Sequence, residues 1–257
     1  MVRVRGLETF KNHFAEYPDQ YVLIGGAASA ELMHQAGLEF RGTRDLDVVL
    51  VVEALRPEFV RAFWNFIEKG KYGSKLQSQT KRQYYRFEKP GDEIYPDCIE
   101  LFSRIPDNIQ FEGQGRFTPI PIDEDISSLS AILLDDAYYP LIVEGKTDVY
   151  GLSCLKAEYL IILKAKAWLD MTRRRASGKQ MDSEKIKKQR NDVIRLFSLL
   201  EPDLRVSIPE TIKDDFREYL KAIQGDNSIN LKDLGIRRLS LQDLVQRFEL
   251  IYGLTQE

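Results

Sequence analysis

The first part of the chain alternates between short apolar runs and segments whose apolar residues recur every three or four positions. The runs at 21–24 and 45–52 are bounded by polar residues or glycine, which is typical of buried strands. Helical spacing occurs in the segment that ends near Pro18, in 27–35 and in 56–69. This part of the chain is therefore predicted to alternate between helices and strands.

The middle of the chain predicts further strands. Two arms at 83–88 and 97–102 flank Pro90-Gly91-Asp92, which is a turn sequence, so they predict a hairpin. Apolar residues in 133–143 and 148–150 predict two more short strands. These segments would extend the same sheet.

The pattern becomes helical after Gly151. Ser153 is predicted to cap a long helix that ends near Arg173. Three more helices are predicted over 182–200, 209–223 and 240–252. The sequence therefore predicts an α+β fold, with a domain over 1–150 that contains a mixed sheet and helices, and a helical domain over 151–257.

Composition narrows the class of protein. The chain has 257 residues, 43% of them hydrophobic and 30% charged, with a formal net charge of -3. These values are typical of a globular protein, and the net charge does not favour general nucleic-acid binding. Cys98 and Cys154 lie in apolar runs and are predicted to be buried thiols, which favours a cytoplasmic protein. We expect no signal peptide and no membrane segment.

The clearest candidate chemistry is the pair Asp45 and Asp47. Residues two apart in a strand point to the same face, so these carboxylates would lie side by side. Two such charges are stabilised by a divalent cation, and Mg²⁺ is commonly held by one or two carboxylates together with substrate phosphates. The pair therefore predicts a site for Mg²⁺ or Mn²⁺.

Gly25 and Gly26 lie where the first strand is predicted to turn into a helix. Glycine permits close approach of the backbone to a ligand, and a helix N-terminus favours phosphate. Ser29 would add a hydroxyl donor in the first turn. A substitution at Gly26 is therefore expected to weaken nucleotide binding more than one at Gly37, which is interpreted only as a helix stop.

A third carboxylate would complete a two-metal site. Glu100 is the first candidate because it stands among apolar neighbours, where an unpaired charge is costly. Asp97 is the alternative, and the alternation of the strand puts these two acids on opposite faces.

The order of these elements resembles a known family. Gly25-Gly26, a helix, and then Arg41-Gly-Thr-Arg-Asp-Leu-Asp47 is similar to the nucleotidyltransferases of the AbiEii toxin type, in the polymerase-beta-like superfamily. The resemblance implies a nucleotidyltransferase-like sheet in which Asp45 and Asp47 bind the metal, and Glu100 is our candidate for the third ligand. The nucleotide is expected to lie against Gly25, Gly26, Ser29, Thr43 and Lys164, and the contact of Lys164 with phosphate is implied by the resemblance.

The resemblance continues into the helical region. Leu160-Ile-Ile-Leu-Lys-Ala-Lys-Ala167 matches a family helix that carries a lysine at Lys164, and Asp192 matches an aspartate of a later motif. Both are implied to be catalytic. Two positions depart from that motif, because Asn191 stands for a lysine and Arg195 for a second aspartate.

Lys164 also allows a simpler interpretation. Its helix is apolar nearly all round, so the lysine either snorkels to solvent or contacts nucleotide phosphate. Lys164→Met is expected to leave stability unchanged or higher. A basic cluster follows in Arg173, Arg174, Arg175, Lys179, Lys185, Lys187, Lys188 and Arg190, and it is either a solvated face or a phosphate contact. His13 and His34 are assigned no catalytic role.

The resemblance implies transfer of a nucleoside monophosphate from an NTP to a hydroxyl of tRNA or protein. It further implies a bacterial toxin with a cognate antitoxin. Two other functions remain open on the same fold. One is a non-catalytic nucleotide-binding or interaction module, and the other is an antibiotic-modifying nucleotidyltransferase.

Overall fold

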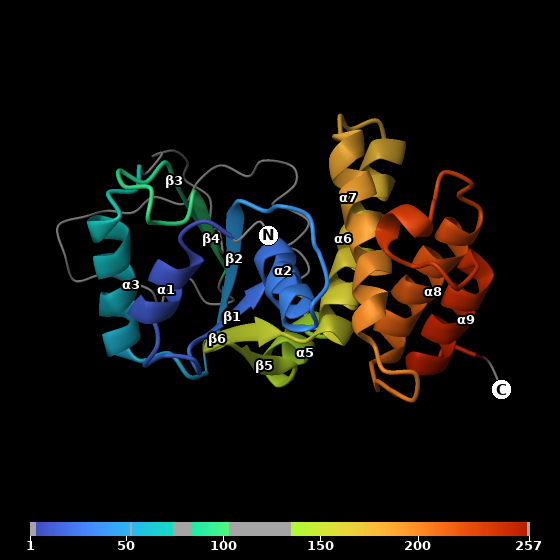
Figure 1. Ribbon diagram of the computed structural model, residues 1–257, viewed down its shortest axis with the longest axis horizontal. Helices are drawn as coiled ribbons and strands as arrows, with labels where there is room; N and C mark the ends of the chain where they lie inside the picture. The colour runs from blue at the N-terminus through green and yellow to red at the C-terminus, as the bar shows by residue number, and fades with distance from the viewer. Residues whose placement is uncertain (1–3, 52, 74–83, 103–134, 256–257) are drawn as a thin grey trace. The chain divides into compact units, whose positions relative to one another are not determined.

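A computed structural model describes four stretches of the chain, residues 4–51, 53–73, 84–102 and 135–255. The chain divides into two compact units. The first unit consists of Met1–Leu134 and Ile142–Lys156, and the second of Asp135–Leu141 and Ala157–Glu257. Figure 1 shows the elements of both units in chain order.

The first unit is built on a six-stranded mixed sheet in the order β3-β4-β2-β1-β6-β5. Its strands are β1 (Tyr21–Ile24), β2 (Asp45–Leu50), β3 (Tyr84–Glu88), β4 (Cys98–Phe102), β5 (Lys146–Val149) and β6 (Leu152–Leu155). β2 pairs with β1 antiparallel and with β4 parallel. The predicted hairpin is confirmed, because β3 and β4 pair antiparallel.

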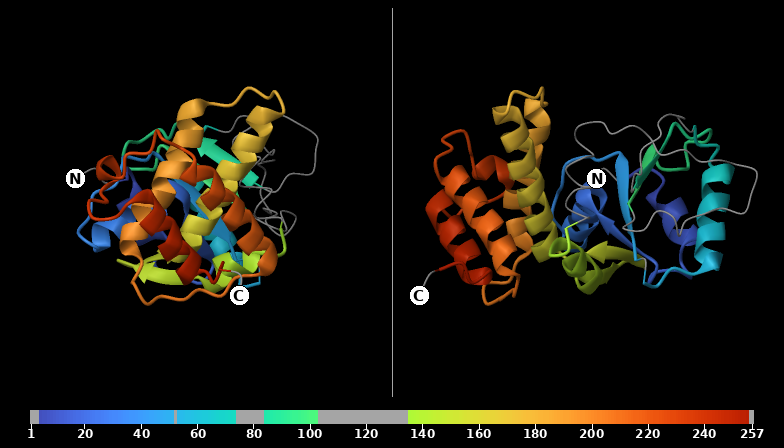
Figure 2. Two further views of the ribbon diagram at one scale, coloured as in Figure 1. Left: turned by 90° about the vertical axis from the view of Figure 1, so that its right-hand side faces the viewer. Right: turned by 180° about the vertical axis from the view of Figure 1, so that it is seen from behind.

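Helices α1 (Leu7–His13) and α3 (Pro57–Lys69) lie side by side in the first unit (Figures 1 and 2). Phe10 of α1 contacts Phe66 of α3 at a ring-centroid distance of 5.8 Å. Phe14, which directly follows α1, contacts the same ring at 5.3 Å. Buried aromatic rings supply much apolar area, so this contact stabilises the unit. Helix α2 (Gly25–Gln35) packs on β1 and β2.

Two predicted elements are wrong. The segment predicted as a strand over 133–143 contains a helix, α5 (Tyr138–Glu144), and residues 133 and 134 lie outside the described stretches. Pro140 is tolerated in the first helical turn, and a short apolar run does not distinguish strand from helix. Ser153 lies inside strand β6, not at a helix start, because β6 pairs with both β1 and β5.

The second unit is a bundle of helices. They are α6 (Ala157–Ala176), α7 (Ser183–Leu196), α8 (Glu210–Gln224) and α9 (Leu241–Ile251), with short 3₁₀ turns η2 (Phe197–Leu199) and η3 (Lys232–Leu234). Helix α6 packs on α7 and α8 (Figure 2). Ser240 caps α9 with a reciprocal bond to Asp243, as its position before an apolar helix favours.

The predicted α+β class is confirmed, with a mixed sheet and helices followed by a helical C-terminal region. Both cysteines are buried free thiols, also as predicted. Within the described stretches, no helix has the length and apolarity that a membrane span requires.

Candidate active site

The turn from β1 into α2 is packed against acidic and hydroxyl side chains. Gly25 has a φ of +65°, and a Cβ at this position would lie 1.8 Å from Oδ2 of Asp47. A Cβ at Gly26 would lie 2.5 Å from Oγ1 of Thr43. Neither place accepts a side chain, so the glycine pair brings the start of α2 directly against the Asp-x-Asp segment.

The three candidate metal ligands lie on two neighbouring strands. Asp45 and Asp47 of β2 are half-buried, and Leu46 between them is fully buried on the opposite face. β2 and β4 run parallel, and their register pairs Asp47 with Glu100. Residues paired in register point to the same face of a sheet. The sheet therefore holds Asp45, Asp47 and Glu100 on one face beside the glycine turn.

Glu100 is held in an unfavourable electrostatic setting. Burial and the neighbouring Asp47 charge raise the pKa of Glu100 to about 9, and a hydrogen bond from Glu100 to Asp47 acts in the same direction. A like charge at short range disfavours ionisation of Glu100. Without a cation the protonated form of Glu100 is therefore favoured, and a bound cation would favour its ionised form.

Asp97 takes a different partner. Its carboxylate forms an ion pair with Arg5, and both side chains are about one third exposed. Asp97 directly precedes β4 and has no partner in the β2–β4 register, which begins with Cys98 opposite Asp45. Of the two alternatives for a third acid, the fold brings Glu100 and not Asp97 beside Asp47.

Arg86 on β3 is a further residue of this site that the sequence did not single out. It lies opposite Glu100 in the β3–β4 register, and its guanidinium is 3.3 Å from Oε1 of Glu100. A positive charge at this place partly balances the acidic face. The sequence of the hairpin arms does not decide which face of the sheet Arg86 occupies, because a shift of one residue in the register moves every side chain to the other face.

The donor set fits a cation that is bound together with substrate. Across the described residues, no three acidic, histidine or cysteine side chains are grouped closely enough to enclose a metal by themselves. Mg²⁺ needs fewer protein ligands, because one or two carboxylates suffice when phosphate oxygens and water complete the coordination. Asp47 and Glu100 supply such a pair, with Asp45 two residues away on the same face.

Ser29 is fully buried in the first turns of α2. Its hydroxyl donates to the carbonyl of Gly25 at 2.6 Å. This bond holds the glycine turn, and the predicted contact of Ser29 with nucleotide stays a prediction.

Lys164 and Asp192 lie in the second unit and bind each other. Nζ of Lys164 donates to Oδ2 of Asp192 at 2.9 Å, and their side chains are 5% and 0% exposed. Arg195, where the family motif carries an aspartate, approaches the other carboxylate oxygen at 3.8 Å. Lys164 therefore does not snorkel to solvent, and its charge is balanced inside the helical bundle.

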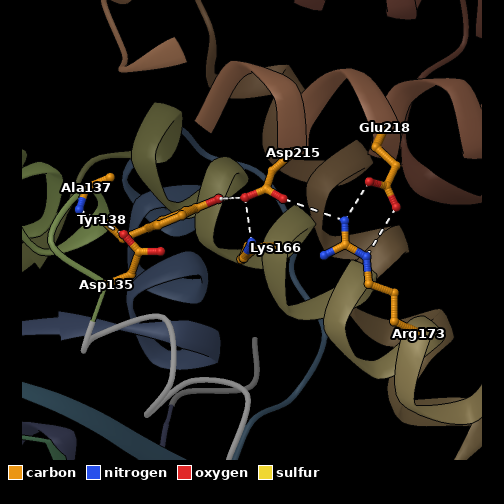
Figure 3. A network of polar contacts seen from close by, with 7 residues as sticks. All are labelled: Asp135, Ala137, Tyr138, Lys166, Arg173, Asp215 and Glu218. Carbon is orange, nitrogen blue, oxygen red and sulfur yellow. Dashed lines mark hydrogen bonds and ion pairs between the residues drawn. The ribbon is translucent and has the colours of Figure 1, made fainter. Parts of the chain in front are cut away.

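Three arginines of the predicted basic cluster form ion pairs within the second unit. Arg173 bonds Glu218, Arg174 pairs with Asp170, and buried Arg190 binds Asp226. Figure 3 shows the neighbouring network, in which Lys166 and the hydroxyl of Tyr138 both donate to Asp215, at 2.5 and 2.8 Å. The bonds of Lys166 and Arg173 tie α6 to α8, so part of the cluster stabilises the bundle.

Gly25→Ala is expected to disable the site, and Gly37→Ala is its matched control. Both glycines have positive φ, +65° and +71°, so alanine costs each about 1 kcal/mol of backbone strain. No described atom lies within 4 Å of a Cβ at Gly37, whereas one at Gly25 displaces Asp47. Metal-dependent NTP binding, measured by calorimetry, should fall in Gly25→Ala alone. Equal binding in the two variants would mean that the glycines form only a turn.

Comparisons with known proteins do not assign a family. No family model matches the chain, and a search of curated proteins finds no significant match. Among solved structures, the chain is similar to an antigenic nucleotidyltransferase-like protein from Paracoccidioides brasiliensis. That similarity has a TM-score of 0.44 and 13% sequence identity, over 93% of this chain and 94% of the other. The chemistry of this chain is therefore inferred from its own residues.

Proposed function

We propose that this protein is a metal-dependent nucleotidyltransferase. The observation that carries the proposal is the acidic face formed by Asp45, Asp47 and Glu100, held against the Gly25–Gly26 turn at the start of α2. Acidic side chains on adjacent strands beside a phosphate-favouring helix start are the parts that a metal–triphosphate complex requires.

Asp45, Asp47 and Glu100 would hold Mg²⁺ or Mn²⁺, which neutralises charge on the triphosphate when it is bound. The backbone of the glycine turn and the positive end of α2 receive the phosphates. An acceptor hydroxyl then forms a bond to the α-phosphorus of the NTP, the bond from that phosphorus to the bridging oxygen breaks, and pyrophosphate leaves. One aspartate accepts the hydroxyl proton.

The acceptor is proposed to be a hydroxyl group of tRNA or of a protein. The resemblance of the Gly-Gly and Asp-x-Asp segments to the AbiEii type supports this choice of acceptor. The same resemblance supports a toxin role with a cognate antitoxin, and a bacterial cytoplasmic setting. The paired residues Lys164 and Asp192 carry the second part of that resemblance, and their role in catalysis remains part of the proposal.

The test is a transfer assay with two labels. The protein is incubated with Mg²⁺, total tRNA, a protein extract, and each NTP labelled at either the α- or the γ-phosphate. Nucleotidyl transfer places the α-label on one acceptor and the γ-label in pyrophosphate. Metal-dependent NTP binding without transfer would indicate a non-catalytic module, and transfer only to an added aminoglycoside would indicate antibiotic modification. Absence of both binding and transfer would overturn the proposal.

A further inference from the structure

A cavity lies in the first unit, and none of the three acids of the acidic face lines it. Its volume is about 530 Å³, and its walls come from α1, the second half of α2, the loop that carries Ile94, and the turn between β5 and β6. Cavities of roughly 300–1,000 Å³ accommodate small molecules in other proteins. This cavity therefore has the size of a small-molecule site.

The wall formed by the β5–β6 turn carries a strained aromatic residue. Tyr150 and Gly151 connect paired residues Val149 and Leu152, and both turn residues have positive φ, +54° and +84°. This is the pattern of a type I′ turn, whose first position favours asparagine or glycine. A bulky side chain there is an outlier, and backbone strain of this kind persists at functional sites.

Tyr150 also presents its ring to the cavity rather than to the core. It is 51% exposed, and its ring lies 5.7 Å from the ring of His34 on α2. Ile94 on another wall is 58% exposed. Among the large hydrophobic residues of the described stretches, three are more than half exposed, and two of these, Ile94 and Tyr150, line this one cavity. Such a concentration of exposed apolar groups marks a binding surface.

The walls are held in place without a ligand. The hydroxyl of Thr9 on α1 donates to the carbonyl of Ile94 at 2.7 Å, and the guanidinium of Arg5 donates to the carbonyl of Glu93 at 2.8 Å. The carboxylate of Asp92 accepts from the amide of Ile94 at 3.0 Å. A preformed site loses less conformational entropy when a ligand binds.

The polar groups of the cavity combine acceptors with donors. Glu31 and His34 line it from α2, and the ion pair between Glu8 and Lys11, at 2.6 Å, lines it from α1. Carboxylates accept from amino groups, while the lysine donates to ring nitrogen or carbonyl oxygen. Apolar walls that carry both donors and acceptors suit a planar ring with both kinds of group.

We propose that this cavity binds an aminated heteroaromatic ring of nucleoside size, stacked on Tyr150. The site is separate from the acidic face, because none of Asp45, Asp47, Glu100 and the two glycines lines the cavity. On α2, the lining residues Glu31 and His34 lie five and eight residues beyond Gly26, which is about 7.5 and 12 Å along the helix axis at 1.5 Å per residue. The ligand needs no phosphate and no metal, which distinguishes it from the NTP of the proposed reaction.

The test uses adenosine and cytidine as probes, with inosine and uridine as matched nucleosides that lack the amino group. Binding is measured by ligand-observed NMR and calorimetry on the full chain, with EDTA present. Tyr150→Asn removes the aromatic ring and introduces a residue that the type I′ turn favours. We expect affinity for adenosine or cytidine to fall by at least about tenfold, as is typical for loss of base stacking, while the melting temperature stays equal or rises.

Leu38→Asn is the control, because Leu38 is another exposed apolar residue and does not line the cavity. It should leave nucleoside binding unchanged. Asp47→Asn should also leave it unchanged, so this proposal survives if the nucleotidyltransferase proposal fails. No binding of either aminated nucleoside, equal affinity in Tyr150→Asn, or equal affinity for the nucleosides without amino groups would overturn it.

Discussion

Replacing Asp47 with asparagine should abolish nucleotidyl transfer while leaving the protein folded. We expect the rate of transfer of α-label to fall by more than about 10³-fold, because groups that stabilise developing charge on the phosphates account for effects of this size. Metal-dependent NTP binding should disappear in the same variant. Both changes are measured against the wild-type protein at saturating Mg²⁺.

The thermal stability of Asp47→Asn should not fall with its activity. Asp47 and Glu100 are neighbours in register, and the buried Glu100 has a raised pKa partly because of the Asp47 charge. Without the Asp47 charge, the pKa of Glu100 falls towards its ordinary value, so the folded protein no longer has to hold a proton on this carboxyl at neutral pH. The melting temperature without metal should therefore stay equal or rise, which separates loss of chemistry from loss of fold.

Asp97→Asn is the matched control, since Asp97 directly precedes the strand of Glu100, β4, but forms a partly exposed ion pair with Arg5. A surface pair contributes about 0–1 kcal/mol, so this variant should retain activity. Glu100→Gln should resemble Asp47→Asn. An inactive Asp97→Asn together with a fully active Glu100→Gln would show that the third acid is Asp97. Full activity of Asp47→Asn would contradict the proposed metal site.

Lys164→Met should destabilise the protein by about 3 kcal/mol. This reverses the expectation from sequence that stability would hold or rise. Lys164 donates to Asp192, whose side chain is fully buried. Removing the Lys164 ammonium therefore leaves the Asp192 carboxylate without its nearest counter-charge. Arg195 at 3.8 Å offsets part of this cost. Chemical denaturation measures the change as a lower midpoint with an unchanged slope.

A double variant identifies the cause. Lys164→Met combined with Asp192→Leu removes both charges, and stability should recover most of the loss, because apolar replacement of a whole buried pair is often neutral. Lys166→Met is the control. Asp215 keeps its bond from Tyr138 and its approach by Arg173, so this loss should be about 1 kcal/mol.

Nucleotide binding by the double variant tests the role that the resemblance implies for Lys164. Unchanged NTP affinity in a stable double variant would restrict the pair to a structural role. A fall of roughly 1.5–3 kcal/mol in binding free energy would support a charge-assisted phosphate contact. If Lys164→Met lost no stability, the buried pair would not be the dominant contact that its geometry indicates.

Local sequence determined the elements that position the acidic face. The sequence predicts strands over 21–24 and 45–52, with the first ended by the glycine pair, and the structure has β1 at Tyr21–Ile24, β2 at Asp45–Leu50 and the glycines at the start of α2. The reason is that period-two alternation and glycine punctuation act through neighbouring residues. The same local rule placed Asp45 and Asp47 on one face, with Leu46 buried on the other.

Partners that are distant in sequence were decided only by the tertiary structure. The choice of Glu100 over Asp97 depended on the parallel register of β2 with β4. Ser153 became part of a strand because β1 and β5 offered ladder partners on both sides. Lys164 was recognised as an unusual charge in an apolar helix, but its partner Asp192 lies 28 positions later.

The same limit applies to the cavity beside Tyr150. The sequence shows Tyr150 before Gly151, but only the hairpin register assigns it a positive φ, and only the fold brings His34 and Ile94 to the same cavity. Periodicity and turn chemistry report on residues within about one helical turn of each other. Register, charge pairing and cavities join residues that are far apart in the chain, so for this protein they followed from tertiary packing and not from the local pattern.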